Sequence, residues 1–325
     1  MIQAPLRIVF LDAATFGDVS LDRFKASWNC TIHPLSAQSE IPGRLEGYQA
    51  AVINKVHLNR SVLEMPTTSE LRLIVVAATG TDNVDLDGAR ARGIKVCNVP
   101  GYASHSVARF TMSLILELAT HVGRYCQVVR AGAWQKSPMF TRLDFPSVEL
   151  YGKKLGIIGY GSIGRSVAEM ARGFGMEVLV SARPGSPEPI PESRLALINL
   201  LGQSDFVTLH CPLTPQTRNL IDSRALALMK PAAFLINTAR GGLVDELALI
   251  DVLKKRRLAG AALDVLTEEP PSPTHPVIIA TQELENLLVT PHCAWSATEA
   301  RQRLLDEVAE NIIAFLKGQE RNCVV

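Results

Sequence analysis

The feature that most constrains the fold is a glycine-rich turn between an apolar run and an amphipathic one. Gly159, Gly161 and Gly164 have the spacing G-x-G-x-x-G, residues 155–158 are apolar, and apolar residues recur at helical spacing after Gly164. In this context the first glycine permits a tight turn, the second lets a pyrophosphate approach the backbone, and the third lets a helix pack closely on its strand. The free amides and the dipole at the start of that helix attract an anion. The segment therefore predicts a strand, a turn and a helix that bind a dinucleotide within a parallel α/β sheet.

Strand-like and helix-like segments alternate along the rest of the chain, which predicts an α/β fold. The strand-like runs in the first hundred residues are "RIVFL", "AAVIN", "LRLIVVAA" and "IKVCNV". A second set consists of "LGIIG", "EVLVS", "FVTLH", "AAFLINTA", "AGAALDV" and "NLLVTPH". We therefore expect two doubly wound parallel-sheet domains, a Rossmann dinucleotide-binding domain inserted into a discontinuous flavodoxin-like substrate domain.

Two helical segments set the expected domain boundaries. The apolar periodicity of residues 107–129 predicts a single long helix at the start of the inserted domain. A second amphipathic segment near the end of the chain can cross back and complete the first domain, because one face carries Leu304, Val308, Ile312 and Leu316. The predicted substrate domain is residues 1–103 and 295–325, and the predicted dinucleotide-binding domain is residues 104–294.

Composition and charge exclude several classes of partner. The 325 residues include 33 Lys or Arg and 32 Asp or Glu with no long basic tract, so we expect no nucleic-acid partner. No apolar run reaches the roughly 18 residues that span a bilayer, and the N-terminus resembles a first strand and not a signal peptide, so we expect no membrane partner. The six cysteines have no metal-ligand spacing. We expect reduced thiols, no bound metal and a cytoplasmic location.

The end of the next strand predicts which dinucleotide is preferred. A carboxylate about 20 residues after the glycines holds the ribose 2′-hydroxyl of NAD, whereas an arginine accommodates the 2′-phosphate of NADP. Here the sequence reads Ser181, Ala182, Arg183. A guanidinium offers a planar, charged fork to a phosphate, and Ser181 offers a hydroxyl donor. We expect NADP(H) to be favoured; NAD(H) is the alternative, in which Arg183 points into solvent and Glu188 reaches the ribose.

Three later motifs place ionisable residues just after apolar strands, at the edge where open α/β sheets bind ligands. Arg240 precedes two glycines, and its forked cation suits a carboxylate beside a carbonyl, although an interdomain salt bridge is the structural alternative. Asp264, Glu268 and Glu269 stand ahead of two prolines. His292 follows the last strand and can exchange a proton near neutral pH, with a neighbouring carboxylate stabilising its charged form. The other histidines are expected to be structural.

Together these motifs resemble the D-isomer-specific 2-hydroxyacid dehydrogenase family, and the resemblance runs nearly end to end. It rests on "AATGTDNVDL" (77–86), "GIIGYGSIGRSVA" (156–168), "LHCPLTPQTRNLI" (209–221), "INTARGGLVDE" (236–246), "GAALDVLTEEP" (260–270) and "VTPHCAW" (289–295). The segments "VINKV", "GAWQKSP" and "DFPSVELYGKKLGIIG" are similar to the glycerate dehydrogenase, or hydroxypyruvate reductase, branch of the family.

The resemblance implies a catalytic role for each member of the polar group. Arg240 would bind the carboxylate and keto group of the substrate, His292 would be the general acid and base, and Glu269 would pair with His292. Asp264 would hydrogen-bond the nicotinamide carboxamide. Substrate binding from both sides of a closing cleft would fall to Lys55, Thr79, Gly80 and Arg240.

The resemblance also implies the cofactor contacts and a partner. Cofactor binding would use the glycine turn and the ends of the following strands, namely Gly159, Gly161, Ser162, Ile163, Gly164, Ser181, Arg183, Cys211, Pro212, Thr217, Thr238, Ala239 and Asp264. The family's active unit is commonly a homodimer built on the nucleotide domain. Arg109 departs from the Glu or Gln of many relatives, and the absent acid near Ala182 departs from the usual NAD pattern.

The implied reaction is the NAD(P)-dependent reduction of hydroxypyruvate, and also of glyoxylate, to the D-2-hydroxy acid. Phosphoglycerate dehydrogenase shares the same core, but the sequence stops at Val325 with no appended regulatory domain. Formate dehydrogenase would be expected to carry Gln in place of Glu269. A transcriptional corepressor of this fold, which would use the nucleotide to sense redox state and bind peptide partners, can retain the same polar residues. Measurable turnover of hydroxypyruvate separates an enzyme from such a sensor.

Overall fold

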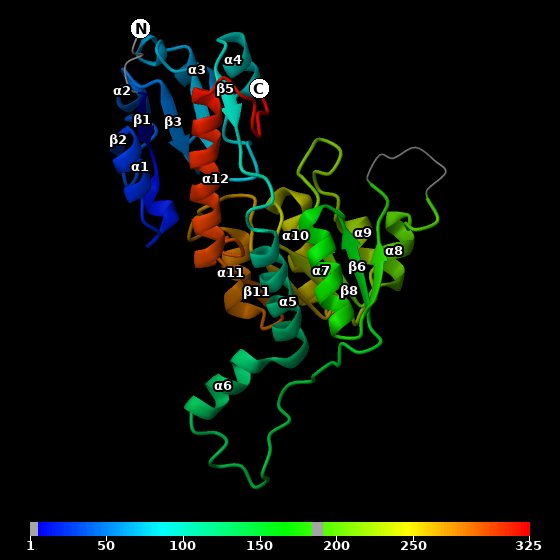
Figure 1. Ribbon diagram of the computed structural model, residues 1–325. Helices are drawn as coiled ribbons and strands as arrows, with labels where there is room; N and C mark the ends of the chain where they lie inside the picture. Colours follow the sequence, from blue (N-terminus) through cyan, green and yellow to red (C-terminus); the bar gives the residue numbers. More distant parts are fainter. Residues whose placement is uncertain (1–5, 184–190) are drawn as a thin grey trace. The chain divides into compact units, whose positions relative to one another are not determined.

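The computed structural model describes residues 6–183 and 191–325, which divide into two compact units. Unit 1 contains residues 1–103 and 296–325, and unit 2 contains residues 104–295. The chain therefore leaves unit 1, forms all of unit 2 and returns to unit 1. Each unit is built on one parallel sheet with helices around it (Figure 1), so the predicted α/β class is confirmed.

The sheet of unit 1 has the strand order β2-β1-β3-β4-β5, which is the flavodoxin-like order. The order in which successive strands are added to the sheet reverses at β1, because β2 lies on one side of β1 and β3 on the other. Its strands are β1 (Arg7–Phe10), β2 (Asn29–Ile32), β3 (Ala50–Ile53), β4 (Leu73–Val76) and β5 (Lys95–Cys97). Its helices are α1 (Asp22–Ser27), α2 (Ile41–Leu45), α3 (Arg60–Leu63), α4 (Leu86–Ala91) and α12 (Thr298–Leu316), with 3₁₀ turns η1 (Ala13–Phe16) and η2 (Pro66–Thr68).

Burial explains which strands of unit 1 could be recognised from the sequence. Every residue of β3 and β4 is buried, as expected for parallel strands covered on both faces. The edge strand β2, "NCTI", has no fully buried residue and no long apolar run, and the sequence did not predict it. Helix α12 packs against β4 and buries Leu304, Val308 and Ile312, so the helix that follows unit 2 completes the core of unit 1.

The sheet of unit 2 has the strand order β11-β10-β9-β8-β6-β7, and all its pairs are parallel. These are the six strands predicted for the Rossmann domain, β6 (Lys154–Ile158), β7 (Glu177–Val180), β8 (Phe206–Leu209), β9 (Phe234–Asn237), β10 (Gly260–Leu263) and β11 (Leu287–Val289). The order reverses between β6 and β8, which creates a switch point where open sheets bind ligands. The helices are α5 (Ser104–Thr120), α6 (Val122–Arg130), α7 (Ser162–Gly173), α8 (Leu197–Gln203), α9 (Ser223–Leu228), α10 (Glu246–Lys254) and α11 (Pro276–Glu283), with the 3₁₀ turn η3 (Gly241–Leu243).

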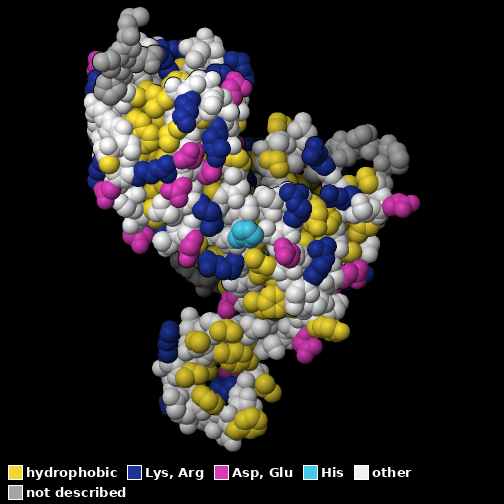
Figure 2. Space-filling model, viewed as in Figure 1, with side chains coloured by type: hydrophobic (Ala, Val, Ile, Leu, Met, Phe, Trp, Pro, Cys, Tyr) yellow, Lys and Arg dark blue, Asp and Glu magenta, His cyan; other side chains and the backbone are white. Residues whose placement is uncertain are grey.

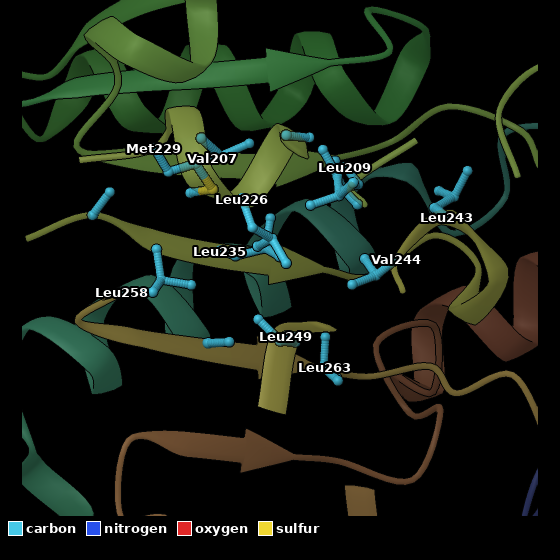
Figure 3. Packing of buried hydrophobic residues seen from close by; sticks show 14 of the residues in the cluster. Val207, Leu209, Leu226, Met229, Leu235, Leu243, Val244, Leu249, Leu258 and Leu263 are labelled. Atoms are coloured by element: carbon cyan, nitrogen blue, oxygen red, sulfur yellow. The ribbon is translucent and has the colours of Figure 1, made fainter. Parts of the chain in front are cut away.

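Alternate residues of each central strand of unit 2 enter cores on opposite faces of the sheet. Val207 and Leu235 belong to the core shown in Figure 3, which α8 to α11 cover. Phe206 and Phe234 belong to the opposite core under α5 and α7, where their rings stack with centroids 5.0 Å apart. Because both faces are filled, the strands are held rigidly, and the loops at their carboxyl ends start from fixed positions.

The segment predicted as one long helix is two helices, and that prediction is wrong. Helix α5 ends at Thr120, and His121 adopts φ +55°, in the left-handed region, before α6 begins at Val122. The apolar periodicity continues across the break, which is why the sequence did not reveal it. Helix α6 and the chain that follows it project away from the sheet of unit 2 (Figure 1).

Candidate active site

The glycine turn after β6 has little space for side chains at two of its three glycines. Gly159 has φ +94°, and a Cβ there would overlap the backbone of His210 and Cys211 after β8. A Cβ at Gly164 would overlap the carbonyl oxygen of Gly159. The turn is therefore pressed against the neighbouring strand end at the switch point, and only glycine fits at these two positions.

Gly161 differs, because a Cβ there would meet nothing within 4 Å. Gly161 is the N-cap of α7, and Ser162 and Ile163 form the first turn of that helix, whose amides have no partner within the helix. Open space therefore lies directly before a positive helix end. This arrangement fits the pyrophosphate of a dinucleotide, which Gly161, Ser162 and Ile163 would hold.

The loop after β8 is stabilised by its own side chains. The Thr217 hydroxyl donates to the carbonyl oxygen of Pro212 at 2.7 Å and accepts from the backbone amide of Thr214 at 2.7 Å. Cys211 is buried, and burial raises the pKa of its thiol to about 11, so it is not a nucleophile. Among the predicted cofactor residues, Cys211 and Thr217 thus shape the loop, whereas Pro212 is exposed on it.

The end of β7 carries the residues predicted to choose between NAD and NADP. Ser181 is buried, and its hydroxyl donates to the carbonyl oxygen of Ala182 at 2.8 Å. Arg183 is exposed. Glu188, the alternative ribose ligand, lies outside the described residues.

Arg240 stands on a loop that begins where β9 ends. The Asn237 side chain accepts from the amide of Ala239 at 3.0 Å and donates to the carbonyl oxygen of Arg240 at 2.8 Å, so it ties the loop to the strand. The Thr238 hydroxyl lies 3.0 Å from the Thr111 hydroxyl of α5, which anchors the loop from below. The half-buried Arg240 guanidinium donates from Nη1 to the carbonyl oxygen of Ala239 at 2.8 Å.

Gly241 brings the Arg240 loop against the loop that carries Glu269. A Cβ at Gly241 would overlap the backbone of Leu266 and Thr267. The two chain segments therefore touch through their backbones, directly beside Arg240 on one loop and three residues before Glu269 on the other. A larger residue at Gly241 would push the two loops apart.

His292 and Glu269 form a close pair within unit 2. The Nδ1 atom of His292 lies 2.6 Å from Oε2 of Glu269, and their side chains are 25% and 33% exposed. Oε1 of Glu269 accepts from the amide of Leu266 at 2.9 Å, so both carboxylate oxygens are engaged. The indole of Trp295 donates to the carbonyl oxygen of His292 at 2.9 Å, and His292 itself has φ +48°. The pair can hold a proton and orient the second ring nitrogen, Nε2.

Asp264 supports the histidine loop from beneath. Its carboxylate is buried and accepts from the Thr290 hydroxyl at 2.6 Å and from the amides of Cys293 and Ala294 at 3.0 and 2.9 Å. The Asp264 carbonyl oxygen also accepts from the amide of His292 at 2.8 Å. Asp264 thus fixes the chain on both sides of His292, and its predicted contact with a nicotinamide carboxamide remains a prediction.

A supporting network around Glu246 did not emerge from the sequence. Both carboxylate oxygens of Glu246 accept hydrogen bonds from Thr267. One accepts from the Thr267 amide at 2.8 Å and the other from the Thr267 hydroxyl at 2.7 Å. The buried His275 lies 3.5 Å from the same carboxylate and also accepts from the amide of Val277 at 3.3 Å at the start of α11. This network fixes the loop between Asp264 and Glu269. A Glu in the first turn of α10 ordinarily indicates only helix capping, so no local signal pointed to this role.

The substrate residues predicted in unit 1 lie at the ends of its strands. The buried Asp12, after β1, accepts from the amides of Asn54, Lys55 and Val56 at 2.5 to 3.1 Å, which folds the loop after β3 at the switch point of this sheet. The Thr79 hydroxyl donates to the carbonyl oxygen of Val99 at 2.9 Å. Thr79 is exposed and Gly80 is half-buried. Asp12 was not predicted, because a single acid after a first strand has no distinctive spacing.

No group of three or more His, Cys, Asp or Glu side chains in the described part of the chain is arranged to hold a metal ion. In residues 6–183 and 191–325, no helix combines the length and apolarity needed to cross a membrane.

The family model "D-isomer specific 2-hydroxyacid dehydrogenase, NAD binding domain" matches residues 112–294. A glycerate dehydrogenase of Methylorubrum extorquens is 41% identical over 323 residues, covering 98% of each chain. A hydroxypyruvate reductase of Blautia hydrogenotrophica is 36% identical over 326 residues, covering 98% of this chain and 99% of that protein.

Solved structures match over the same length. An acyclic imino acid reductase in complex with NADPH and D-Arg has a TM-score of 0.85 at 27% identity, covering 98% of this chain and 100% of that chain. A D-lactate dehydrogenase of Aquifex aeolicus, complexed with NAD and lactic acid, has a TM-score of 0.82 at 27% identity, covering 96% of each chain.

Proposed function

The chain belongs to the D-isomer specific 2-hydroxyacid dehydrogenase family, a family of oxidoreductases that use a nicotinamide dinucleotide, and we propose that it reduces hydroxypyruvate to D-glycerate with NADPH as the preferred cofactor. Glyoxylate, which shares the 2-oxo acid group, is expected to be a second substrate. The observation that carries the proposal is the His292–Glu269 pair on loops that follow adjacent strands, with the Arg240 loop pressed against the Glu269 loop.

Each of these side chains has a defined chemical task in the proposed reaction. A bound reduced nicotinamide supplies the hydride. His292 gives its proton to the oxygen of the keto group as that oxygen becomes an alcohol, and Glu269 stabilises the protonated imidazole that precedes this transfer. Arg240 binds the substrate carboxylate and the keto oxygen through its forked N–H donors, which orients the acid and stabilises the developing negative charge. Asp264 and Gly241 position the loops.

The preference for NADPH is supported by charge at the end of β7. Arg183 is exposed there, and the described residues Ser181 and Ala182 provide no carboxylate that would repel a 2′-phosphate. In NAD-binding Rossmann domains an acidic residue in this region holds the ribose hydroxyl. The similar structures hold NADPH in one case and NAD in the other, so both cofactors occur within this fold.

A homodimer through unit 2 is supported by the projecting segment 122–149. It exposes an unusual set of large apolar side chains, since the exposed fractions are 57% for Val122, 50% for Trp134, 92% for Phe140 and 80% for Leu143. Figure 2 shows hydrophobic side chains gathered on this segment. Exposed patches of this kind mark interfaces. A Phe140→Asp, Leu143→Asp double variant is expected to shift the dimer to monomer in light-scattering measurements; a wild-type monomer contradicts the proposal.

The proposed location is the cytoplasm, since all six cysteines are free thiols.

One assay tests the proposed reaction. The purified protein is given hydroxypyruvate, glyoxylate, pyruvate and 3-phosphohydroxypyruvate, each with NADPH and with NADH, and the loss of reduced nicotinamide is followed. The largest kcat/KM is expected for hydroxypyruvate with NADPH. A maximum with the phosphorylated substrate would identify a phosphoglycerate dehydrogenase, and absence of turnover in every combination would favour a nucleotide-sensing corepressor.

A further inference from the structure

Arg194 lies beside the glycine turn and the end of β7, although it follows Gly164 by too many residues to belong to the usual fingerprint. Its guanidinium carbon is 5.0 Å from the centroid of the Tyr160 ring, and Tyr160 stands between the first two glycines of the turn. Its Nη1 donates to the carbonyl oxygen of Ser181 at 3.4 Å. Arg194 therefore bridges the two chain segments between which the adenosine ribose of a dinucleotide would lie.

Backbone hydrogen bonds hold the Arg194 segment in place. Leu195 forms a parallel bridge with Ser181, in which the amide of Leu195 donates to Val180 at 2.9 Å and the amide of Ala182 donates to Leu195 at 2.8 Å. The backbone at Arg194 is thus held next to the end of β7. It is half-buried, and no ion pair joins it to an acidic side chain among the described residues.

We propose that Arg194 is a second binding residue for the 2′-phosphate of NADPH, acting together with Arg183. The inference rests on the proposed function, because it requires that the 2′-phosphate be bound at the end of β7. Stacking on Tyr160 keeps the guanidinium plane in one orientation. The contact with Ser181 uses one of its five N–H donors, which leaves others for phosphate oxygens.

The test compares two fragments that differ only in the 2′-phosphate, adenosine 2′,5′-bisphosphate and adenosine 5′-monophosphate, by calorimetric titration of the purified protein. The wild-type protein is expected to bind the bisphosphate at least tenfold more tightly. In Arg194→Ala the ratio of the two affinities is expected to fall roughly tenfold, since charged hydrogen bonds to a phosphate are worth that much. The affinity for the monophosphate should change little. Arg194→Lys, which keeps the charge but not the planar stacking, should fall between them.

Arg172→Ala is the matched control, because Arg172 is an exposed arginine at the far end of α7. It removes the same charge and should leave the ratio unchanged. An unchanged ratio in Arg194→Ala overturns the proposal. Equal weakening of both fragments also overturns it, because that result indicates a structural role. A wild-type protein that does not distinguish the fragments removes both this inference and the NADPH preference, whereas inactivity toward hydroxypyruvate affects neither result.

A separate observation in unit 1 carries a second inference. Cys97 of β5 and Cys323 face each other across an antiparallel bridge, with their sulfur atoms 3.3 Å apart. The amide of Asn98 donates to Asn322 at 3.1 Å, and the amide of Val324 donates to Val96 at 2.8 Å. These bonds flank the cysteines, so the cysteines occupy the close position of the ladder, where Cα atoms are about 4.5 Å apart, within the range of disulfides.

The backbone around this pair is fixed by Asn311 of α12. Its buried side chain donates to the carbonyl oxygen of Asn98 at 2.9 Å and accepts from the Asn322 side chain at 3.0 Å. Both strands of the bridge are thereby tied to one helix. A disulfide would require the two sulfur atoms to close from 3.3 Å to a bonded distance of about 2.0 Å.

We infer that Cys97 and Cys323 form a disulfide when the protein meets hydrogen peroxide. The partly exposed Cys323 is oxidised first, to a sulfenic acid with release of water. The sulfur of Cys97 then attacks the sulfenic sulfur, and its proton leaves with the hydroxide as a second molecule of water. Burial and the neighbouring Cys323 raise the pKa of the Cys97 thiol to about 12, so Cys97 itself reacts poorly with peroxide and is not the cysteine oxidised first.

Peptide mapping without reductant tests this inference. After mild peroxide treatment, the native protein is expected to yield a linked peptide pair containing Cys97 and Cys323, lighter by two hydrogen atoms than the two separate peptides. Cys323→Ser should abolish the pair, and Cys126→Ser, which removes an exposed cysteine in unit 2, should leave it unchanged. The inference is overturned if Cys97 is recovered as a free thiol under conditions that oxidise Cys126. It is also overturned if Cys323 is recovered only as a sulfinic or sulfonic acid.

Discussion

The Nδ1 atom of His292 lies 2.6 Å from Oε2 of Glu269, although 22 residues separate them in the chain and they come from loops after different strands. The contact assigns Nδ1 to the carboxylate and leaves Nε2 to exchange a proton with a substrate. An acidic companion in this position also stabilises the positive charge that the ring carries before it donates.

His292→Ala is expected to lower kcat for hydroxypyruvate reduction by about 10² to 10⁴-fold, the usual contribution of a general acid. Dissociation constants for the reduced nicotinamides, measured by fluorescence titration, should change less than about threefold, because the cofactor contacts lie at other strand ends. Loss of cofactor binding to the same extent as kcat would instead assign His292 a structural role.

Glu269→Gln is expected to lower kcat for hydroxypyruvate reduction by about tenfold, because the neutral amide cannot stabilise the protonated imidazole that donates to the substrate, and a charged hydrogen bond is worth about that much. Steady-state kinetics with hydroxypyruvate measure the change. Glu268→Gln is the matched control, because the exposed Glu268 is adjacent in sequence and should leave kcat unchanged. If both variants behave alike, the pairing has no catalytic effect.

Two glycine substitutions should have opposite consequences. Gly241→Ala forces a Cβ into the backbone of Leu266, so we expect about 1–3 kcal/mol of lost stability and strongly reduced turnover. Gly161→Ala meets open space and should unfold at the same denaturant concentration as the wild-type protein, while its cofactor KM rises, because the methyl group occupies space assigned to the pyrophosphate. Chemical denaturation and steady-state kinetics check both. Normal cofactor binding by Gly161→Ala would show that the pyrophosphate lies elsewhere.

His210 should make the protein less stable in acid. Burial lowers the pKa of His210 from 6.5 to about 3, so between these pH values the unfolded chain binds a proton that the folded chain does not. Stability from this source is complete above pH 6.5 and declines as the pH falls toward 3, with a slope of about 1.4 kcal/mol per pH unit.

The slope is measured by urea unfolding of wild-type protein and His210→Asn at several pH values. The variant is expected to be less stable at neutral pH, since the Thr208 hydroxyl loses its contact with Nε2 at 3.0 Å. The slope of its unfolding free energy against pH should nevertheless be smaller than that of the wild-type protein, because about one fewer proton is taken up on unfolding. His105→Asn, which removes an exposed histidine, should keep the wild-type slope. Parallel slopes for wild type and His210→Asn would contradict the buried neutral state.

The sequence predicted the sheets better than their edges and breaks. Central strands such as β3 and β4 are continuous apolar runs because both faces of the sheet are covered, and such runs are visible without a structure. The edge strand β2 lacks this signal, and the turn at His121 is hidden because apolar periodicity continues through a single left-handed residue. Unit boundaries follow the switch from one set of strands to the next.

The residues that support the site were mostly invisible in the sequence. Arg240, Glu269 and His292 follow strands within recognisable motifs, whereas Glu246, Asn237 and Asp12 act through contacts that only the folded chain creates. Ser181 illustrates the same limit, because its hydroxyl could be expected to face a ligand but donates to the carbonyl oxygen of Ala182. Motif spacing predicts which loops meet, and packing decides where each polar atom points.

Hydride transfer assisted by the His292–Glu269 pair is tested by the product formed from hydroxypyruvate and NADPH that carries two deuterium atoms at C4 of the nicotinamide. Chiral chromatography with mass detection measures both the configuration and the label of the glycerate. We predict D-glycerate with one deuterium at C2, formed by the wild-type protein and nearly absent with His292→Ala. Unlabelled glycerate, the L-isomer, or equal yields from the two proteins would contradict hydride transfer assisted by the His292–Glu269 pair.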